Sequence, residues 1–118
     1  MEKILLIHGD EATERKVRNV AGRLKMNMER LERPAGENRL EDLAQGRMTT
    51  EDPENTEPSL LLFCGLREKR LDKLLFELRR EETSVDYKAI LTSTNRTWTL
   101  RQLYLELERE KAAISRKS

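Results

Sequence analysis

Continuous hydrophobic stretches alternate along the chain with stretches in which hydrophobic residues recur every three or four positions. The continuous stretches predict buried strands at residues 3–8, 59–64 and 87–91. A weaker, charge-rich stretch at residues 26–33 predicts an edge strand. The periodic stretches predict helices at residues 11–25, 39–46 and 67–82, and a last one from residue 100.

This alternation of strands and helices predicts a single α/β domain over residues 1–118. We expect three layers around a four-stranded parallel sheet of order 2-1-3-4, joined by right-handed crossovers, in a flavodoxin-like arrangement without its fifth strand. Residues 34–58 differ from the rest because they are rich in Pro, Gly and acidic residues, and there we expect a short helix and a mobile acidic loop. No internal repeat is evident.

The overall composition argues against several classes of partner. The 118 residues contain 23 Lys and Arg against 22 Asp and Glu, so no field of one sign dominates, and we expect neither nucleic acid nor a membrane as a partner. The first apolar run is too short for a signal peptide or a membrane span. The single Cys allows no intrachain disulfide, and these features favour the cytoplasm.

Cys64 is the residue on which an enzymatic function would depend. Arg70 follows it at the spacing of a phosphatase phosphate loop, but Glu68 would place an anion in that loop. With His8 at a neighbouring strand end, Cys64 could form a nucleophile and base pair. We expect a structural Cys and assign no catalytic residue. An enzyme acting on a phosphorylated or acyl substrate through Cys64 and His8 is the alternative.

Metal and cofactor sites are not expected. One His and one Cys supply too few ligands for a metal ion, and the acidic residues are scattered along the sequence.

The segment 92–99 concentrates the side chains best suited to bind a ligand. It follows a predicted strand and precedes a helix, and ligands of parallel sheets bind at the carboxyl ends of the strands. In the expected sheet His8, Asp10, Cys64 and Thr92 share one such edge. We therefore expect an anion such as a carboxylate or phosphate to be bound by residues chosen from this edge. The candidate ligand-binding residues are Thr92, Thr94, Asn95, Arg96, His8 and Asp10.

Much of the same segment is also explained as the start of a helix. Thr99 and Gln102 have the spacing of a capping box, in which each side chain bonds the backbone amide of the other residue. Trp98 and Leu103 have the spacing of a hydrophobic staple. Both interpretations of the segment remain open at this point.

The second half of the chain resembles a known bacterial family. The strand at residues 60–65, the Leu-rich helix after it and the Thr-x-x-Asn-x-x-Trp pattern of residues 92–98 are similar to the family named domain of unknown function 3783. The resemblance covers residues 59–110. It implies a small cytoplasmic α/β domain and brings no established activity.

Two apolar residues lie off the hydrophobic stripes of their helices. Phe76 and Leu105 each lie about 140° around the helix from a stripe residue, so we expect both to face outward. A surface formed by them would support a homodimer.

These features together predict a non-enzymatic binding or regulatory module that presents the segment from Thr92 to Trp98 to a small anionic ligand or a protein partner. The alternatives are the enzyme described above and a structural homodimerisation domain that uses Phe76 and Leu105.

Overall fold

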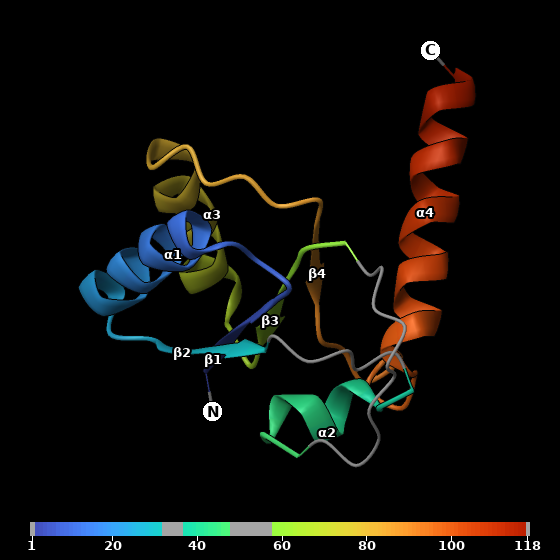
Figure 1. Cartoon of the computed structure of the whole chain (residues 1–118), viewed down its shortest axis with the longest axis horizontal. Coiled ribbons are helices and arrows are strands. Elements are labelled where there is room, and N and C mark those ends of the chain that lie inside the picture. Colours follow the sequence, from blue (N-terminus) through green and yellow to red (C-terminus); the bar gives the residue numbers. More distant parts are fainter. Residues whose placement is uncertain (1, 32–36, 48–57, 118) are drawn as a thin grey trace. The chain divides into compact units, whose positions relative to one another are not determined.

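The computed structural model describes residues 2–31, 37–47 and 58–117. The chain forms two compact units, one of Met1–Glu32 with Thr56–Leu91 and one of Arg33–Asn55 with Thr92–Ser118. Every predicted strand and helix is confirmed, with ends that agree within two residues, whereas the predicted acidic loop lies outside the described residues. The elements, shown in Figure 1, are β1 (Lys3–Ile7), α1 (Glu11–Leu24), β2 (Asn27–Leu31), α2 (Leu40–Ala44), β3 (Leu60–Cys64), α3 (Glu68–Arg80), β4 (Tyr87–Ile90) and α4 (Leu100–Lys117).

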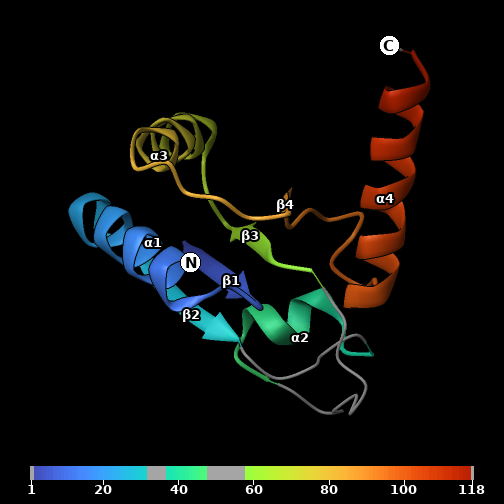
Figure 2. The same cartoon turned by 45° about the horizontal axis from the view of Figure 1, so that its top comes forward.

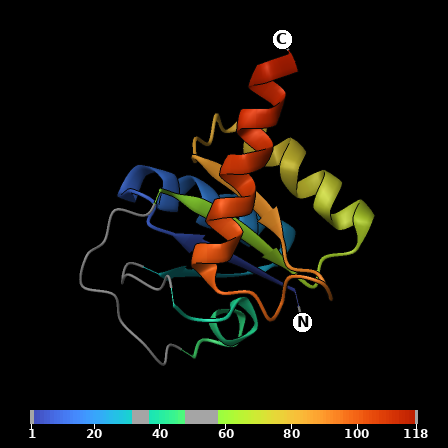
Figure 3. The ribbon, with the colours of Figure 1, turned by 90° about the vertical axis from the view of Figure 1, so that its right-hand side faces the viewer.

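The first unit contains a four-stranded sheet of mixed polarity. Its order, β2-β1-β3-β4, is the predicted one and can be followed in Figure 3. β1 and β2 are parallel, as are β3 and β4, but β1 and β3 are antiparallel. The prediction of an all-parallel, flavodoxin-like sheet is therefore wrong, while the three-layer arrangement stays a prediction.

The long connection between β2 and β3 explains why the polarity was not predictable. Within each strand–helix–strand motif, the helix returns the chain to the edge at which the first strand began, so the two strands run parallel. Residues 32–59 join the two motifs. A connection of this length can bring the chain back at either end of the sheet, and the apolar pattern of the strands carries no information on that choice.

The two β-α-β motifs of the first unit are related by a local two-fold axis perpendicular to the sheet. The axis passes between Leu5 and Leu62, which lie opposite one another in the β1–β3 pair. Those two residues are 57 positions apart, as are Glu11 and Glu68, which begin α1 and α3. The spacing grows to 60 positions at β2 and β4, because the connection after α3 is longer. The structure thus contains an internal repeat, which the sequence analysis missed.

Residues with a left-handed backbone conformation occupy equivalent positions in the two motifs. His8 (φ 56°) and Gly65 (φ 69°) both follow a central strand, and Lys25 (φ 57°) and Glu82 (φ 54°) both follow a helix. Positive φ is uncommon for residues other than Gly. Two such pairs at the same spacing of 57 positions show that the motifs share one backbone path.

The helices α1 and α3 cover the same face of this sheet (Figures 1 and 2). Alternate side chains of the central strands point to that face, and the helices contribute residues spaced three or four positions apart. The intervening apolar residues of β1 and β3 are buried as well, which accounts for their continuous apolar sequence. The core under the helices consists of Ile4, Leu6, Val17, Val20, Ala21, Met26, Leu61, Phe63, Leu74 and Leu78.

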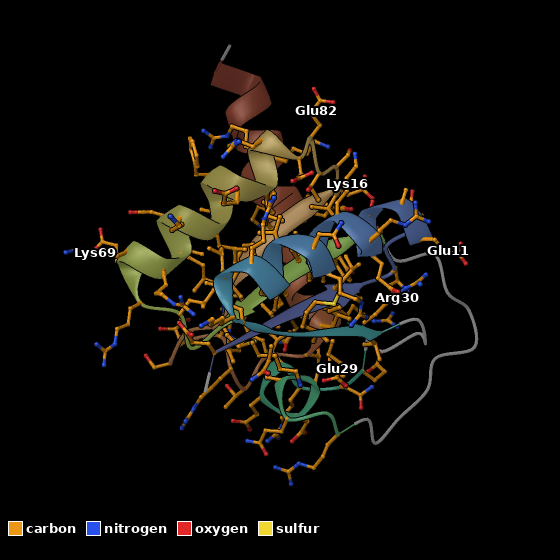
Figure 4. All side chains as sticks on the ribbon, turned by 90° about the vertical axis from the view of Figure 1, so that its left-hand side faces the viewer. Glu11, Lys16, Glu29, Arg30, Lys69 and Glu82 are labelled. Carbon is orange, nitrogen blue, oxygen red and sulfur yellow. The ribbon has the colours of Figure 1, made fainter. Side chains whose placement is uncertain are left out.

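Charged side chains connect α1 to β2 and to α3. Arg30 of β2 donates one hydrogen bond to the Glu14 carboxylate and one to the Gly9 carbonyl, each at 3.0 Å (Figure 4). Arg23 pairs with Glu81, just after α3, at 2.9 Å. Because exposed ion pairs contribute little, the half-buried contacts of Arg30 matter more to stability than the pair of Arg23.

In the second unit, α2 and α4 begin at a shared antiparallel bridge between Arg39 and Thr99. The two bridging hydrogen bonds, each of 2.9 Å, run from the Leu40 amide to the Trp98 carbonyl and from the Leu100 amide to the Asn38 carbonyl. Arg39 and Thr99 are 60 positions apart, which is also the spacing between β2 and β4. The repeat therefore continues into the second unit.

A buried Leu-x-x-Leu pattern follows each bridge residue. The leucines are Leu40 with Leu43 in α2 and Leu100 with Leu103 in α4. Among the described residues, none of the helices is both long and apolar enough to cross a membrane.

Truncation of Leu74 should strongly destabilise the first unit. Leu74 is a residue of α3 whose side chain is fully buried in the core. Leu74→Ala therefore leaves a cavity, and we expect it to lower the free energy of unfolding by about 2–5 kcal/mol. Urea denaturation followed by circular dichroism measures the loss. The exposed neighbour Lys73 provides the control, since Lys73→Ala should change stability by less than about 0.5 kcal/mol. Equal losses of stability in Leu74→Ala and Lys73→Ala would contradict the packing of the Leu74 side chain in the core.

Candidate functional site

The sheet polarity separates residues that the sequence analysis placed on one edge. Cys64, at the end of β3, lies opposite Lys3 at the start of β1, whereas His8 follows the other end of β1. Five residues of a strand span about 16 Å, which puts the backbones of His8 and Cys64 far beyond hydrogen-bond reach. The expectation that His8, Asp10, Cys64 and Thr92 share one edge is therefore wrong, and His8 and Cys64 form no catalytic pair.

Asp10 acts as the N-cap of α1. Its carboxylate accepts a hydrogen bond from the Thr13 amide at 2.7 Å, and this bond holds the pKa of Asp10 below its usual value. His8 lies two residues earlier, in the left-handed conformation that turns the chain out of β1. Both residues thus have a local structural role in the first unit.

Cys64 has the properties of a structural thiol. Its side chain is buried, and the lack of solvation raises the pKa from 9.0 to about 11, so the thiol stays protonated at neutral pH. Arg70, the residue at phosphate-loop spacing, instead forms a bidentate pair with Glu2 through hydrogen bonds of 2.8 and 2.6 Å. The guanidinium of Arg70 lowers the pKa of Glu2 in turn. These contacts remove the support for a phosphatase-like loop.

The loop of residues 92–99 is held by reciprocal hydrogen bonds in the second unit. The Thr92 amide donates to Asn95 Oδ1 at 2.8 Å, and the Asn95 amide donates to Thr92 Oγ1 at 3.1 Å. The backbone amides of Arg96 and Trp98 donate to the Thr92 and Asn95 carbonyls. Asn95 is buried, while Thr94 and Arg96 are exposed. Thr92 and Asn95 therefore stabilise the turn itself, and Thr94 and Arg96 face the solvent.

The predicted capping box at the start of α4 is confirmed. The Thr99 amide donates to Gln102 Oε1 at 2.9 Å, and the Gln102 amide donates to Thr99 Oγ1 at 3.2 Å. Leu103 is buried and Trp98 is half-buried. The proposed staple between Trp98 and Leu103 stays a prediction.

The bridge between α2 and the loop brings Arg96 beside two charged side chains at the start of α2, Arg39 and Glu41. The Glu41 amide donates to the Arg96 carbonyl at 2.9 Å. The Glu41 carboxylate lies 3.9 Å from Arg96 Nε and 4.0 Å from Arg39. Both arginine side chains are 62% exposed. We call this group the Arg39–Arg96 surface, defined by Arg39, Glu41 and Arg96.

Arg96 was predicted from the sequence as a ligand-binding residue, whereas Arg39 was not. The two are far apart in sequence, and only the backbone bridge at Arg39 and Thr99 places them around one carboxylate. The Leu-x-x-Leu pattern that follows both bridge residues was the available signal, because it marks two helix starts of the same kind.

No candidate metal centre is found in the described part of the chain. There, no three His, Cys, Asp or Glu side chains converge closely enough to hold a metal ion.

Phe76 and Leu105 are exposed, as predicted. Their exposed fractions are 56% and 58%. Phe76 belongs to the first unit and Leu105 to the second. A surface shared by the two residues, and the homodimer it would support, stay predictions.

Comparison with known proteins finds one match to a family model, in the second half of the chain. Residues 59–114 match the family model described as Domain of unknown function (DUF3783), as the resemblance indicated. No curated protein and no solved structure matches the chain significantly. The matched region includes the whole loop of residues 92–99, and the bonds of Thr92, Asn95 and Thr99 show that this loop is built to start α4.

Removal of either capping-box side chain should weaken the second unit. Thr99→Ala removes the acceptor for the Gln102 amide, and we expect it to lower the free energy of unfolding by about 0.5–2 kcal/mol. Gln102→Ala removes the reverse bond. Chemical denaturation of both single variants and the double variant measures their coupling. Strictly additive losses would argue against the reciprocal pair.

Burial of Cys64 should make stability fall at high pH. The thiol has its pKa near 9.0 when exposed and near 11 when folded, so the folded chain holds the proton more tightly. Its contribution is complete below pH 9 and is lost as the pH rises towards 11. Between these values the wild type should lose roughly 2 kcal/mol more stability than Cys64→Ala, as measured by urea denaturation. Parallel pH profiles would contradict this assignment.

Proposed function

We propose that this protein is a non-enzymatic binding or regulatory module that holds a small anionic ligand, or an acidic group of a partner, at the Arg39–Arg96 surface. The family resemblance and the single thiol support the accompanying proposal that it acts in the bacterial cytoplasm. The observation that carries the proposal is the pairing of two exposed arginines with one carboxylate, that of Glu41, within the part of the chain that the structure describes.

The charge balance of this surface favours an anion. Glu41 lies close to 4 Å from both guanidinium groups, at the outer limit of an ion pair, and its own side chain is 33% exposed. Counted over the described residues, two cations share this carboxylate, and one positive charge is left over. Arginine binds carboxylates and phosphates with paired N–H groups, so an incoming anion can contact both side chains.

The backbone beneath the surface is well held. Arg96 follows a turn fixed by the reciprocal bonds of Thr92 and Asn95, and Arg39 is fixed by its bridge to Thr99. Preorganised donors lose less conformational entropy when they bind. Thr94 is exposed on the same loop.

The enzymatic alternative has lost the residues on which it depended. Cys64 is a buried thiol with a raised pKa, and His8 lies at the opposite end of β1. Binding without covalent chemistry therefore accounts better for the polar side chains that remain exposed.

A thermal-shift screen with inorganic phosphate, citrate and phosphoserine tests the proposal. A ligand that binds the folded protein raises its melting temperature. We expect at least one of the three to stabilise the wild type, and Arg96→Ala to weaken that ligand by about tenfold or more, because a charge-assisted hydrogen bond is lost.

Arg101→Ala is the matched control. Arg101 is also an exposed arginine of the second unit, but its guanidinium pairs with Glu37 at 2.9 Å. This variant should respond to the ligand like the wild type. A response that is lost equally in both arginine variants would show general charge screening and would refute the Arg39–Arg96 surface as a site.

A further inference from the structure

The large exposed apolar side chains of the described residues all lie in the second half of the chain. They are Phe76, Ile90 and Leu105. Applying the spacings of the internal repeat gives their counterparts in the first half, which are Asn19, Arg30 and Gln45. The shared fold is built with a polar residue at each of these positions in one half. Folding alone therefore does not require the apolar residues of the other half.

Phe76 lies at the centre of an outward-facing surface on α3. Its ring is 56% exposed, and the Arg80 guanidinium lies over it at 5.9 Å from the ring centre. Lys73 lies about one helical turn before Phe76. Lys69 lies one turn further towards the N-terminus of α3 and points into solvent in Figure 4. Arg79 is exposed on the other side of the ring. We call these five residues the α3 face.

The equivalent surface of α1 serves as an internal control. Where α3 has Lys69, Phe76 and Arg79, α1 has Ala12, Asn19 and Gly22. These α1 positions are exposed as well. Since α1 and α3 pack on the same sheet in the same way, the large side chains of α3 serve no packing role that α1 also needs.

The remaining two basic residues of the α3 face, Lys73 and Arg80, correspond to Lys16 and Arg23 on α1, and the contacts of the two pairs differ. On α1, Lys16 donates to the Glu82 carbonyl at 3.3 Å and Arg23 pairs with Glu81 at 2.9 Å. Arg80, the counterpart of Arg23, pairs with Glu77 of its own helix at 3.6 Å. Lys73, the counterpart of Lys16, makes no such bond among the described residues, nor do Lys69 and Arg79. Lys16 and Arg23 of α1 thus bond to groups at the end of α3, while Lys69, Lys73 and Arg79 of the α3 face are available to a partner.

The charge of the α3 face determines which partner fits it. Four cations lie around Phe76. The stretch from Lys69 to Arg80 has two carboxylates, Asp72 and Glu77, and Glu77 is shared between Arg80 at 3.6 Å and Arg23 of α1 at 3.5 Å, so positive charge remains in excess. An exposed aromatic ring flanked by arginine is the composition of an energetically important centre in a protein interface. A partner with acidic groups around an apolar side chain complements both features.

We propose that the α3 face docks an acidic segment of another protein that places an apolar side chain on Phe76. This surface is separate from the Arg39–Arg96 surface, and the inference does not depend on the function proposed for that surface. A double-stranded nucleic acid fits less well, because recognition of its phosphates by charge alone leaves the exposed ring unused. A single strand that stacks a base on the ring is the competing occupant that the oligonucleotide below tests. A second copy of this chain would bring a second basic α3 face against the first.

Selection from a displayed library of random linear peptides tests the proposal. We expect the wild type to enrich peptides that combine Asp or Glu with Leu, Ile or an aromatic residue. The decisive variant is Phe76→Asn, which installs the residue that the fold already uses at Asn19. It should weaken the best peptide at least about tenfold in fluorescence anisotropy while the protein unfolds at the same urea concentration as the wild type.

Further variants and probes separate the alternatives. Lys69→Ala, which copies Ala12, should also weaken the peptide and reduce the salt dependence of binding, whereas Asn19→Ala on α1 should have no effect. A single-stranded oligonucleotide and light scattering of the protein alone complete the experiment. Failure to enrich acidic peptides, equal binding by Phe76→Asn, tight binding of the oligonucleotide, or Phe76-dependent self-association would each overturn the proposal.

Discussion

Antiparallel pairing of β1 with β3 is the interaction on which the rest of the first unit depends. It joins two β-α-β motifs. Without this pairing, β1 and β3 would each have a neighbouring strand on one side only. It also places α1 and α3 on one face, where a single apolar core serves both helices. A shift of this strand pair by one residue would exchange the two faces of β3, so Leu61 and Phe63 would leave the core under α1 and α3.

The same pairing determines where function can be located. Because the central strands run in opposite directions, the loops after β1 and β3 emerge at opposite ends of the sheet. The edge rich in polar residues that an all-parallel sheet would have provided does not exist. Polar groups suited to binding are found instead on the second unit and on the outer surface of α3.

The sequence contained enough information to predict the elements and their order but not the polarity of the sheet. Apolar runs such as Leu60–Cys64 and the leucine stripe of α3 depend on local periodicity, which one sequence displays. The direction of β3 relative to β1 depends on a long connection with few apolar residues. The internal repeat was hidden for a related reason: burial conserves the position of a core side chain, as in Val17 and Leu74, without conserving its identity.

The candidate site was predictable to a similar extent. The capping box of Thr99 and Gln102 follows from their spacing, whereas the neighbourhood of Arg39 and Arg96 depends on a backbone bridge between distant segments, and no local pattern encodes it. The family match over residues 59–114 does not extend to the first half, although that half repeats the same elements.

The bridge at Arg39 and Thr99 couples the two copies in a way that limits how each can change. Both α2 and α4 start from one pair of reciprocal amide–carbonyl bonds, so a residue inserted in the loop before either helix would shift the register of both starts at once. The bridge is made by backbone groups, so it accepts side chains as different as those of Arg39 and Thr99. The segments that lead into the bridge must therefore keep their lengths in step with one another. At the bridge, we expect the two halves of this chain to tolerate changes of side chain far more readily than changes of length.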